Sequence, residues 1–465
     1  MLKKLFSHTL IYGLAPQIVK LAQVFILPAI TPYLTAKDYG IFGIVTATAG
    51  ALTIFGSLGL NIVLANSFTK SPLHFKWLWR QIFGFLNLWS FAYAIIATVV
   101  IFLFLPAEVE NQAGMIIILN VLPLVLFAPS TTIGGLYYQL MQKPMEIAVR
   151  SVGTGLLTLA LNLYFIRVLK MGYMGWFWAA AIAQVLNQFS YYYSLRYREG
   201  IVPIYNFKRR TILRHLKTCL PTLPHFYSYY ILGSFDRVIM KMLGLPIAEI
   251  GKYNAAQMPA GLVGTATNAA NQAVSPLLLK AYKDDDRKIE KSLNFITMIA
   301  CLTGSSVLCL FLKELLPVII RSEGLEHLYP MAIILVMAYN YRPMYTAANN
   351  RLFFTERTTA LLKVTFIAAA LSVILNFLLI YLWGSIAAAV VLFVCFMYMG
   401  YSGFFIREFK ESNGTAHYPL VWLSLTLVLT IFVYFAADFP LWVKVIIALI
   451  FCLTGGFSIR KIYQR

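Results

Sequence analysis

The feature that most constrains this chain is a series of apolar blocks separated by short polar loops. A helix needs about 20 consecutive, mainly apolar residues to cross the hydrocarbon core of a bilayer. Fourteen blocks of this kind are predicted, near residues 10–32, 40–64, 81–105, 114–139, 147–166, 173–195, 218–243, 250–279, 292–320, 328–350, 359–381, 384–406, 418–436 and 440–459. The sequence therefore predicts an all-α polytopic membrane protein with about 14 transmembrane helices.

Composition supports this class and argues against others. Of the 465 residues, 60% are hydrophobic and 12% are charged, whereas about 25% of the residues of an ordinary soluble domain are charged. The net charge of +20 comes from Lys and Arg scattered through short loops, and such residues accumulate on the cytoplasmic side of membrane proteins. No motif for RNA or DNA accompanies these charges, so we expect no nucleic-acid partner.

The loops also predict the orientation of the chain. If the N-terminus is cytoplasmic and fourteen spans follow, most of the 38 Lys and Arg residues fall in loops on the inner side, as the positive-inside rule requires. Both termini are then cytoplasmic. The N-terminal stretch MLKKLFSHTL leads into the first block without a small-residue cleavage site, so we expect this block to remain as a span.

Enzymatic chemistry has little support. All five cysteines lie in apolar blocks and none is part of a CxxC pair, so we expect neither a disulfide framework nor a metal site. No HExxH, GxSxG or Walker motif is present, and no loop is long enough to form a soluble catalytic domain. We expect no catalytic residue and no cofactor, so any transport must use an ion gradient, the membrane potential or the gradient of the substrate.

An internal repeat becomes visible when the chain is shifted by 211 residues. Asp38 then coincides with Glu249 and Gly40 with Gly251 (251 − 40 = 211), and an aromatic residue follows in each copy. The shift preserves the odd or even number of each span, so the repeat is parallel. We therefore predict an N-terminal six-helix lobe (1–200), a basic cytoplasmic linker (201–217), a C-terminal six-helix lobe (218–410) and two additional helices (411–465).

A stripe of small and polar residues follows each copy of the repeated motif. Spacing of three and four places the members of each stripe on one helical face. The two sets are Thr46, Gly50, Thr53, Ser57 and Asn61, and Gln257, Gly261, Gly264, Asn268 and Gln272. Small residues can serve only close helix packing, and this alternative stays open, but amides facing lipid would lack partners. We predict a water-filled cavity between the halves in which the substrate contacts Asn61, Gln257, Asn268 and Gln272.

Cations and tyrosines inside the predicted spans extend this candidate site. A lysine at mid-membrane costs about 3 kcal/mol, and intramembrane cations usually face a cavity. Lys20 lies near the middle of the first span, and Arg342 lies in a polar, aromatic stretch of the tenth. We predict that Lys20, Arg342, Tyr227 and Tyr341 bind substrate, with snorkelling or structural pairing as the alternative for the cations. Lys444, near the outer end of a span, is expected to snorkel.

The seventh span combines a broken start with adjacent opposite charges. Pro221 and Pro224 must interrupt its backbone ladder, as Pro123 does in the fourth span, and broken helices at membrane depth tend to line cavities. Asp236 and Arg237 are adjacent near the outer end of the seventh span. Two roles stay open for Asp236 and Arg237: a structural salt bridge or interfacial anchoring, and ion coupling or gating.

Four short motifs resemble the polysaccharide flippases that export O-antigen and capsule repeat units. These are KDYGIFG at 37–43, SLGLN at 57–61, the Asp236–Arg237 pair and GKYNA at 251–255. The resemblance implies the MATE-like arrangement of the wider MOP exporter group, with two pseudo-symmetric six-helix lobes plus two C-terminal helices.

The resemblance also implies a substrate and a setting. The substrate would be an undecaprenyl-diphosphate-linked oligosaccharide, transferred across the bacterial inner membrane by alternating access with proton or sodium coupling. Lys20 or Arg342 would then pair with the diphosphate. A glycan polymerase and a chain-length regulator are expected as partners in addition to the lipid bilayer, and the flippase itself is expected to be a monomer.

Three alternative functions follow from the same residues. A MATE-type drug/cation antiporter usually has twelve spans and buries acidic residues, whereas the buried charge here is mainly basic and favours an anionic substrate. A lipid II flippase shares fourteen spans and a cationic cavity but resembles the opening motif less. A membrane glycosyltransferase or glycan polymerase would need catalytic residues on sizeable outer loops, and the outer loops predicted here are short.

Overall fold

The computed structural model describes residues 22–23, 26–70, 73–220, 223–322, 325, 327–355, 358–411 and 417–464. Within these ranges all regular elements are helical. The first part of the chain forms η1 (Thr31–Tyr33), α2 (Ala36–Ser57), α3 (Asn61–Lys70), α4 (Phe75–Phe104), η2 (Ala107–Gln112), α5 (Ala113–Val125), α6 (Ala128–Leu140), α7 (Pro144–Asn162), η3 (Leu163–Val168), α8 (Tyr173–Tyr193), η4 (Ser194–Arg198) and α9 (Arg209–Cys219). The second part forms α10 (Leu223–Met242), α11 (Ile247–Lys283), α12 (Arg287–Leu310), α13 (Leu312–Ile319), α14 (Tyr329–Ala338), α15 (Tyr341–Phe354), α16 (Thr358–Trp383), α17 (Ser385–Ser402), α18 (Arg407–Glu411), α19 (Pro419–Ala436) and α20 (Leu441–Tyr463).

These helices confirm the predicted polytopic membrane fold. Every predicted span after the first overlaps one helix or two consecutive helices, and the first span falls largely outside the described residues. By length and apolar composition, 8 of the described helices can cross a membrane, or 9 if the bent pair α5–α6 is one span. The remaining predicted spans are either more polar, as in α8, α10 and α11, or divided, as in α14 and α15.

Two of the predicted spans are broken rather than straight. The fourth bends by 46° between α5 and α6, close to Pro123, which predicts a break, and Phe127 at the bend has a left-handed φ of 58°. The second span ends earlier than predicted. Leu58 (φ 50°) and Gly59 (φ 72°) turn the chain after α2, so Asn61 begins a new helix instead of continuing the stripe.

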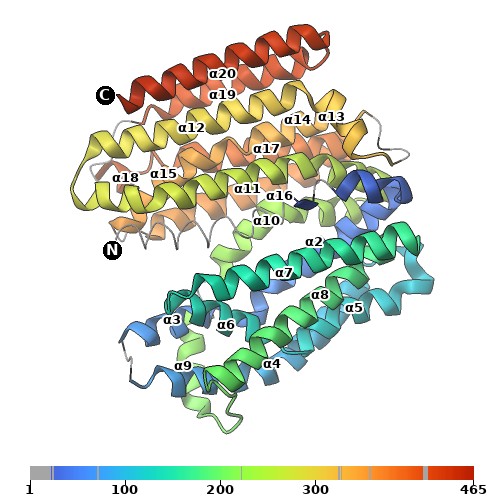
Figure 1. Cartoon of the computed structure of the whole chain (residues 1–465), viewed down its shortest axis with the longest axis vertical. Helices are drawn as coiled ribbons and strands as arrows, with labels where there is room; N and C mark the ends of the chain where they lie inside the picture. Colours follow the sequence, from blue (N-terminus) through green and yellow to red (C-terminus); the bar gives the residue numbers. More distant parts are fainter. Residues whose placement is uncertain are drawn as a thin grey trace.

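The helices form two groups with α2 between them (Figure 1). The N-terminal group comprises α3–α9, and the C-terminal group comprises α10–α20 with α19 and α20 on its outer side, against α12. Helix α2 contacts α4 and α8 of the first group and α10 and α11 of the second. The two groups lie closest where α2 and α11 begin and diverge toward the opposite end (Figure 1).

The start of α2 crosses the start of α11 through a reciprocal glycine contact. Helix α2 begins at Ala36 and α11 at Ile247, 211 residues later. A Cβ atom added to Gly40 would collide with the carbonyl oxygen of Ile247, and one added to Gly251 would collide with the carbonyl oxygen of Ala36. Ala36 and Ile247 are equivalent positions in the repeat, as are Gly40 and Gly251. Each glycine therefore contacts the counterpart of the residue that the other glycine contacts, and the crossing has pseudo-twofold symmetry. The repeat predicted from the sequence therefore marks a real packing contact.

Hydrogen bonds join the C-terminal group to η1, α2 and the end of α4 at this same end. The Asn254 side chain donates to the carbonyl oxygen of Tyr39 (3.2 Å), and Lys241 donates to the carbonyl oxygen of Leu105 at the end of α4 (2.8 Å). Thr31 accepts from the backbone N–H of Arg321 through its hydroxyl (3.0 Å). These contacts fasten the groups at the end where α2 and α11 begin.

Candidate transport site

A wall of the C-terminal group formed by α11 and α15 contains a polar cavity of about 300 Å³. It is lined by Asn268, Asn271 and Ser275 of α11 and by Arg342, Tyr345, Thr346 and Asn350 of α15. The break between α14 and α15, at Tyr339 and Asn340, places Arg342 in the first turn of α15. The cavity therefore combines one cation with several amides and hydroxyls, a set suited to an anionic, hydrogen-bonding ligand.

Hydrogen bonds fix the side chains of this wall. The Arg342 guanidinium donates to the Asn268 amide oxygen. Asn271 donates to the Thr346 hydroxyl (3.1 Å), which in turn donates to the carbonyl oxygen of Arg342 (2.9 Å). The guanidinium carbon also lies 5.6 Å from the centre of the Tyr339 ring. These contacts hold the Arg342 head group in a defined position at the cavity.

Only part of the predicted substrate site meets at this cavity. Arg342 and Asn268 line it, whereas Tyr341 is 1% exposed and packs on Phe396 (ring centres 4.4 Å apart). Gln257 is buried elsewhere in α11. The placement of Tyr341 indicates packing rather than ligand contact. Tyr345, one turn later on the same helix, lines the cavity instead. The spacing of four between the two tyrosines places them on the same side of a helix, so the sequence could have indicated Tyr345 as well.

The other predicted substrate residues lie apart from this wall or outside the described residues. Asn61 is exposed at the start of α3 and accepts a hydrogen bond from the Ser57 hydroxyl (3.3 Å). Tyr227 in α10 packs against Phe55 of α2 (ring centres 6.3 Å apart). Lys20 and the side chain of Gln272 are not among the described parts of the chain.

Asp236 and Arg237 meet a third residue, Tyr253, inside the C-terminal group. Asp236 is 4% exposed and accepts hydrogen bonds from the Tyr253 hydroxyl and from the backbone N–H of Arg237 (2.8 Å). The Arg237 guanidinium carbon lies 5.9 Å from the centre of the Tyr253 ring. Tyr253 is the aromatic residue of the repeated motif, and its contact with Asp236 could not be read from the repeat.

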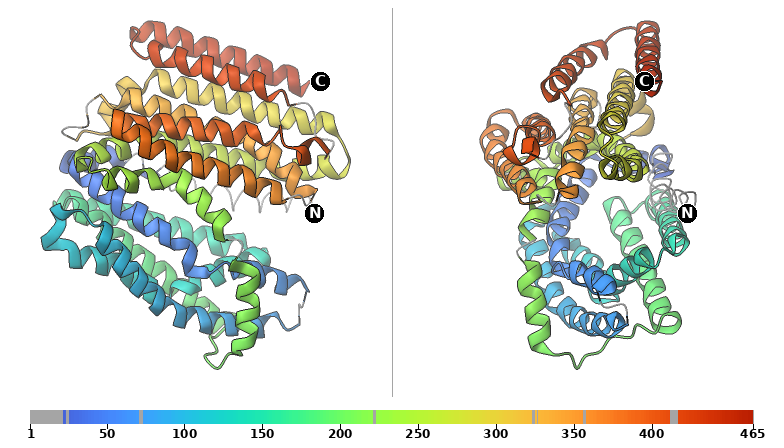
Figure 2. Two further views of the ribbon diagram at one scale, coloured as in Figure 1. Left: turned by 180° about the vertical axis from the view of Figure 1, so that it is seen from behind. Right: turned by 90° about the vertical axis from the view of Figure 1, so that its left-hand side faces the viewer.

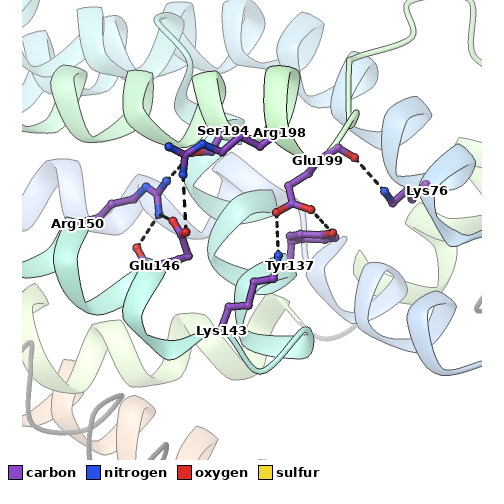
Figure 3. A network of polar contacts seen from close by, with 8 residues as sticks. All are labelled: Lys76, Tyr137, Lys143, Glu146, Arg150, Ser194, Arg198 and Glu199. Carbon is purple, nitrogen blue, oxygen red and sulfur yellow. Dashed lines mark hydrogen bonds and ion pairs between the residues drawn. The ribbon is translucent and has the colours of Figure 1, made fainter.

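A second polar network lies in the N-terminal group (Figure 3). Glu199 accepts from the Tyr137 hydroxyl (2.5 Å) and from Lys143 (3.1 Å). Burial alone would raise the pKa of Glu199, but these hydrogen bonds outweigh it and lower the pKa. Arg150 donates to Glu146 (2.7 Å) and stacks near the Tyr191 ring. These contacts tie α6, α7 and the end of α8 together, which favours a structural role.

Lys444 corrects one prediction. Its side chain is 0% exposed and donates to Glu314 of α13 (2.6 Å), so the expectation of snorkelling is wrong. At the same end Lys313 pairs with Asp438 in the α19–α20 turn (2.7 Å), and this hydrogen bond lowers the pKa of Asp438. The two ion pairs fasten the C-terminal helix pair to α13. Among the described residues no group of three or more His, Cys, Asp or Glu is arranged to hold a metal ion.

Comparison with known proteins identifies a family for this chain and similar solved structures for its fold. Residues 2–282 match the family model "Polysaccharide biosynthesis protein", while no curated protein sequence matches significantly. A solved structure of the lipid II flippase MurJ in an inward closed conformation is similar over 98% of this chain and 99% of its own (TM-score 0.74, 14% identity). An inward-facing multidrug resistance MATE family transporter of the MOP superfamily is similar over 90% and 98% (TM-score 0.58, 14% identity).

An outward-facing MATE transporter of the same superfamily is also similar, over 91% of this chain and 95% of its own (TM-score 0.57, 14% identity). At these identities the structural matches concern the fold, whereas the family match covers more than half of the sequence. The chain therefore belongs to the polysaccharide biosynthesis protein family and is a multi-pass membrane protein with the fold of the MurJ and MATE structures.

Proposed function

We propose that this protein is a flippase that moves an oligosaccharide linked to undecaprenyl diphosphate from the cytoplasmic to the outer leaflet of a bacterial inner membrane. The observation that carries the proposal is the polar cavity at Arg342 and Asn268. A guanidinium offers several fixed donors to phosphate oxygens, and the surrounding amides and hydroxyls suit sugar hydroxyls. Both chain ends lie in the cytoplasm in this proposal.

The arrangement of the two helix groups supports alternating access from the inner side. Hydrogen bonds join the groups where α2 and α11 begin, and the ribbons diverge toward the opposite end (Figure 1). A substrate headgroup would enter from that opposite end and leave after the glycine crossing opens. Rocking of one lobe against the other is a known way for two related halves to alternate access.

Asp236 and Arg237 are proposed to couple ion binding to this movement. The carboxyl of Asp236 is buried beside the Tyr253 hydroxyl, and α11, which holds Tyr253, also forms the glycine crossing. A change in the charge of Asp236 would therefore act on the helix that closes the outer end. Buried carboxyls within transporters commonly have such roles.

The lipid-linked intermediates give the most direct test of the substrate. Deletion of the gene should cause undecaprenyl-linked repeat units to accumulate on the cytoplasmic leaflet and should reduce surface glycan. Accumulation of lipid II instead would favour the peptidoglycan precursor as substrate. Unchanged glycans with altered drug sensitivity would favour an antiporter. A glycan polymerase and a chain-length regulator are proposed to act on the exported product, and co-purification would test their contact with the flippase.

Arg342 gives a residue-level test with a matched control on the same helix. R342Q should lower export at least tenfold, because a hydrogen bond between a charged group and the substrate is worth about 1.5–3 kcal/mol. Arg351 is also in α15, but it pairs with buried Glu290 (3.5 Å). R351Q should therefore lower the thermal stability of the purified protein more than R342Q does. Normal export in R342Q at normal protein levels would contradict the role of the cavity.

A further inference from the structure

Helix α9, in the predicted linker, lies across the spans rather than along them. When the spans are viewed end-on, α9 runs along the flank of the N-terminal group, as the right-hand view of Figure 2 shows. A helix on the flank of a membrane bundle and perpendicular to its spans lies parallel to the plane of the membrane. This position is that of an interfacial helix.

The sequence of α9 gives it three different faces. Ile212 (2% exposed) and Cys219 (0%) are buried in the core of the N-terminal group, with Leu216 packed against that core. Leu213 and Leu220, seven positions apart, share the neighbouring face and remain 47% and 44% exposed. One face therefore contacts protein, and a second leaves two leucines uncovered.

The third face is basic. Arg210, Arg214 and Lys217 are exposed and follow the spacing of four and three that places them on one side of the helix. Lys208 and Arg209 add two more exposed cations at the N-terminal end of α9. An uncovered apolar face beside a basic edge is the pattern of a helix at the boundary between acyl chains and headgroups.

The segment before α9 is attached to the spans at the depth expected for this boundary. Lys76 donates to the carbonyl oxygen of Glu199 (2.9 Å), and further along α4 Asn87 donates to the Tyr205 hydroxyl (3.3 Å). These eleven residues of α4 (87 − 76 = 11) correspond to about 16 Å of helix. The segment therefore follows α4 from its start toward the apolar part of the span, and α9 begins four residues after Tyr205.

Backbone contacts make this attachment rigid. Arg80 donates to the carbonyl oxygen of Val202 (3.0 Å) and its own carbonyl accepts from the N–H of Ile204 (2.9 Å). Gly84 leaves no room for a Cβ beside the Ile204 carbonyl. Exposed Trp77 (50%) and Tyr197 (67%) lie at the same end of this group, and such aromatic residues are enriched at membrane interfaces.

We propose that α9 is an interfacial helix whose basic edge, Arg210, Arg214 and Lys217, binds anionic phospholipid headgroups of the cytoplasmic leaflet. Leu213 and Leu220 insert among the upper acyl chains, and the three cations extend to the phosphates. Because the preceding segment is fixed to α4, this binding anchors the N-terminal group at the membrane surface while the C-terminal group moves.

Depth measurement tests the placement of α9. Spin labels at L213C and R210C, in full-length protein in which C301A and C452S remove the other accessible thiols, would be compared in nanodiscs of phosphatidylglycerol and phosphatidylcholine. The label at 213 should be relaxed mainly by oxygen, as in acyl chains, and the label at 210 mainly by a water-soluble nickel complex. Equal exposure of both labels to the nickel complex would overturn the proposal.

Lipid retention tests the chemistry of the basic edge. In native mass spectrometry the unmodified protein should retain phosphatidylglycerol, and the variant R210Q/R214Q/K217Q should retain at least fivefold less. K37Q/R167Q/K170Q removes three exposed cations at the opposite end of the spans and should retain the normal amount. R210K/R214K keeps the charge, so it should bind phosphatidylglycerol normally and show that the glutamine variant fails through charge rather than misfolding.

The remaining outcomes identify other occupants. Equal loss of phosphatidylglycerol and phosphatidylcholine from the triple variant would overturn a headgroup-specific site. If the triple variant retained phosphatidylglycerol but lost pyrophosphate binding, the edge would be a docking site for a soluble phosphate or for the substrate, and the proposal would be wrong.

Discussion

Helices α2 and α11 begin as counterparts and end differently. Both start at equivalent positions and cross through Gly40 and Gly251. Helix α2 then stops at Ser57 after 22 residues, where Leu58 and Gly59 adopt left-handed conformations, whereas α11 is 37 residues long and ends at Lys283. The first halves of the two helices are thus built alike, and the second half of α11 alone extends into the wall of the polar cavity. The two helices are symmetric where they cross and asymmetric at the candidate site.

The likeness extends to the acidic residue that begins each helix. Asp38 accepts from the backbone N–H of Tyr173 at the start of α8 (3.2 Å), and Glu249 accepts from the Ser385 hydroxyl at the start of α17 (3.2 Å). Gly172 and Gly384, which precede α8 and α17, both have positive φ values of 56° and 65°. The acidic residues therefore join α2 to α8 and α11 to α17. Both α8 and α17 begin after a glycine with a positive φ.

The largest effect should follow from filling the glycine crossing. G40A and G251A each place a Cβ against a backbone carbonyl that cannot move without separating α2 and α11, so each should lower the free energy of unfolding by about 1–3 kcal/mol and reduce export. Thermal unfolding of the purified protein measures the first effect. The double variant should cost less than the sum, because one substitution already separates the helices.

Gly261 supplies the control for this prediction. It lies in α11, and no atom lies within 4 Å of the position of an added Cβ. G261A should leave stability unchanged or raise it slightly, since alanine favours helix over glycine. If G261A were as damaging as G251A, a general loss of helix flexibility would replace the crossing as the explanation.

The sequence predicts the repeat but not the contact that the repeat makes. The 211-residue shift depends on local residue types, so it identifies Gly40 and Gly251 as equivalent positions, whereas the crossing of α2 and α11 through these glycines is known only from the structure. The break at Leu58 could not be predicted, because a leucine beside a glycine within an apolar block is equally typical of continuing helix. Contacts between distant residues leave no local pattern either. Lys444 and Glu314 are 130 positions apart, and only packing reveals that they meet.

Arg342 and Asn268 show what residue type alone can predict. Both are predicted to bind substrate because a cation and an amide inside a span need polar partners, and the structure joins them by a hydrogen bond. Tyr341 and Tyr345 have the same type and neighbouring positions, yet Tyr341 packs on Phe396 while Tyr345 lines the cavity. The turn at which α15 begins decides between them, and composition carries no information about it.

The two acidic counterparts, Asp38 and Glu249, should differ in how much their replacement lowers the free energy of unfolding. Asp38 forms a capping box with Thr35 and also accepts from Tyr173, so D38A should cost about 1–2 kcal/mol. Glu249 pairs with Lys252 while both side chains remain more than a third exposed, so E249A should cost less than about 1 kcal/mol. Unfolding measurements on both variants would check the order, and a reversed order would show that the Ser385 contact dominates.

Effects of similar size should come from exchanging the residue types where the two helices diverge. Gly59 has a left-handed φ of 72°, whereas its counterpart, exposed Ala270 (270 − 211 = 59), lies inside α11. G59A should cost about 1–2 kcal/mol because an L-residue disfavours this conformation. A270G should cost about 1 kcal/mol because glycine is the poorer helix former. Glycine thus suits the turn after α2, and alanine suits the interior of α11. Each residue type would be unfavourable at the other position. If G59A were neutral in thermal unfolding, the turn after α2 could relax into a continuous helix, and the contrast between α2 and α11 would reflect a shallow preference of the backbone rather than a fixed break.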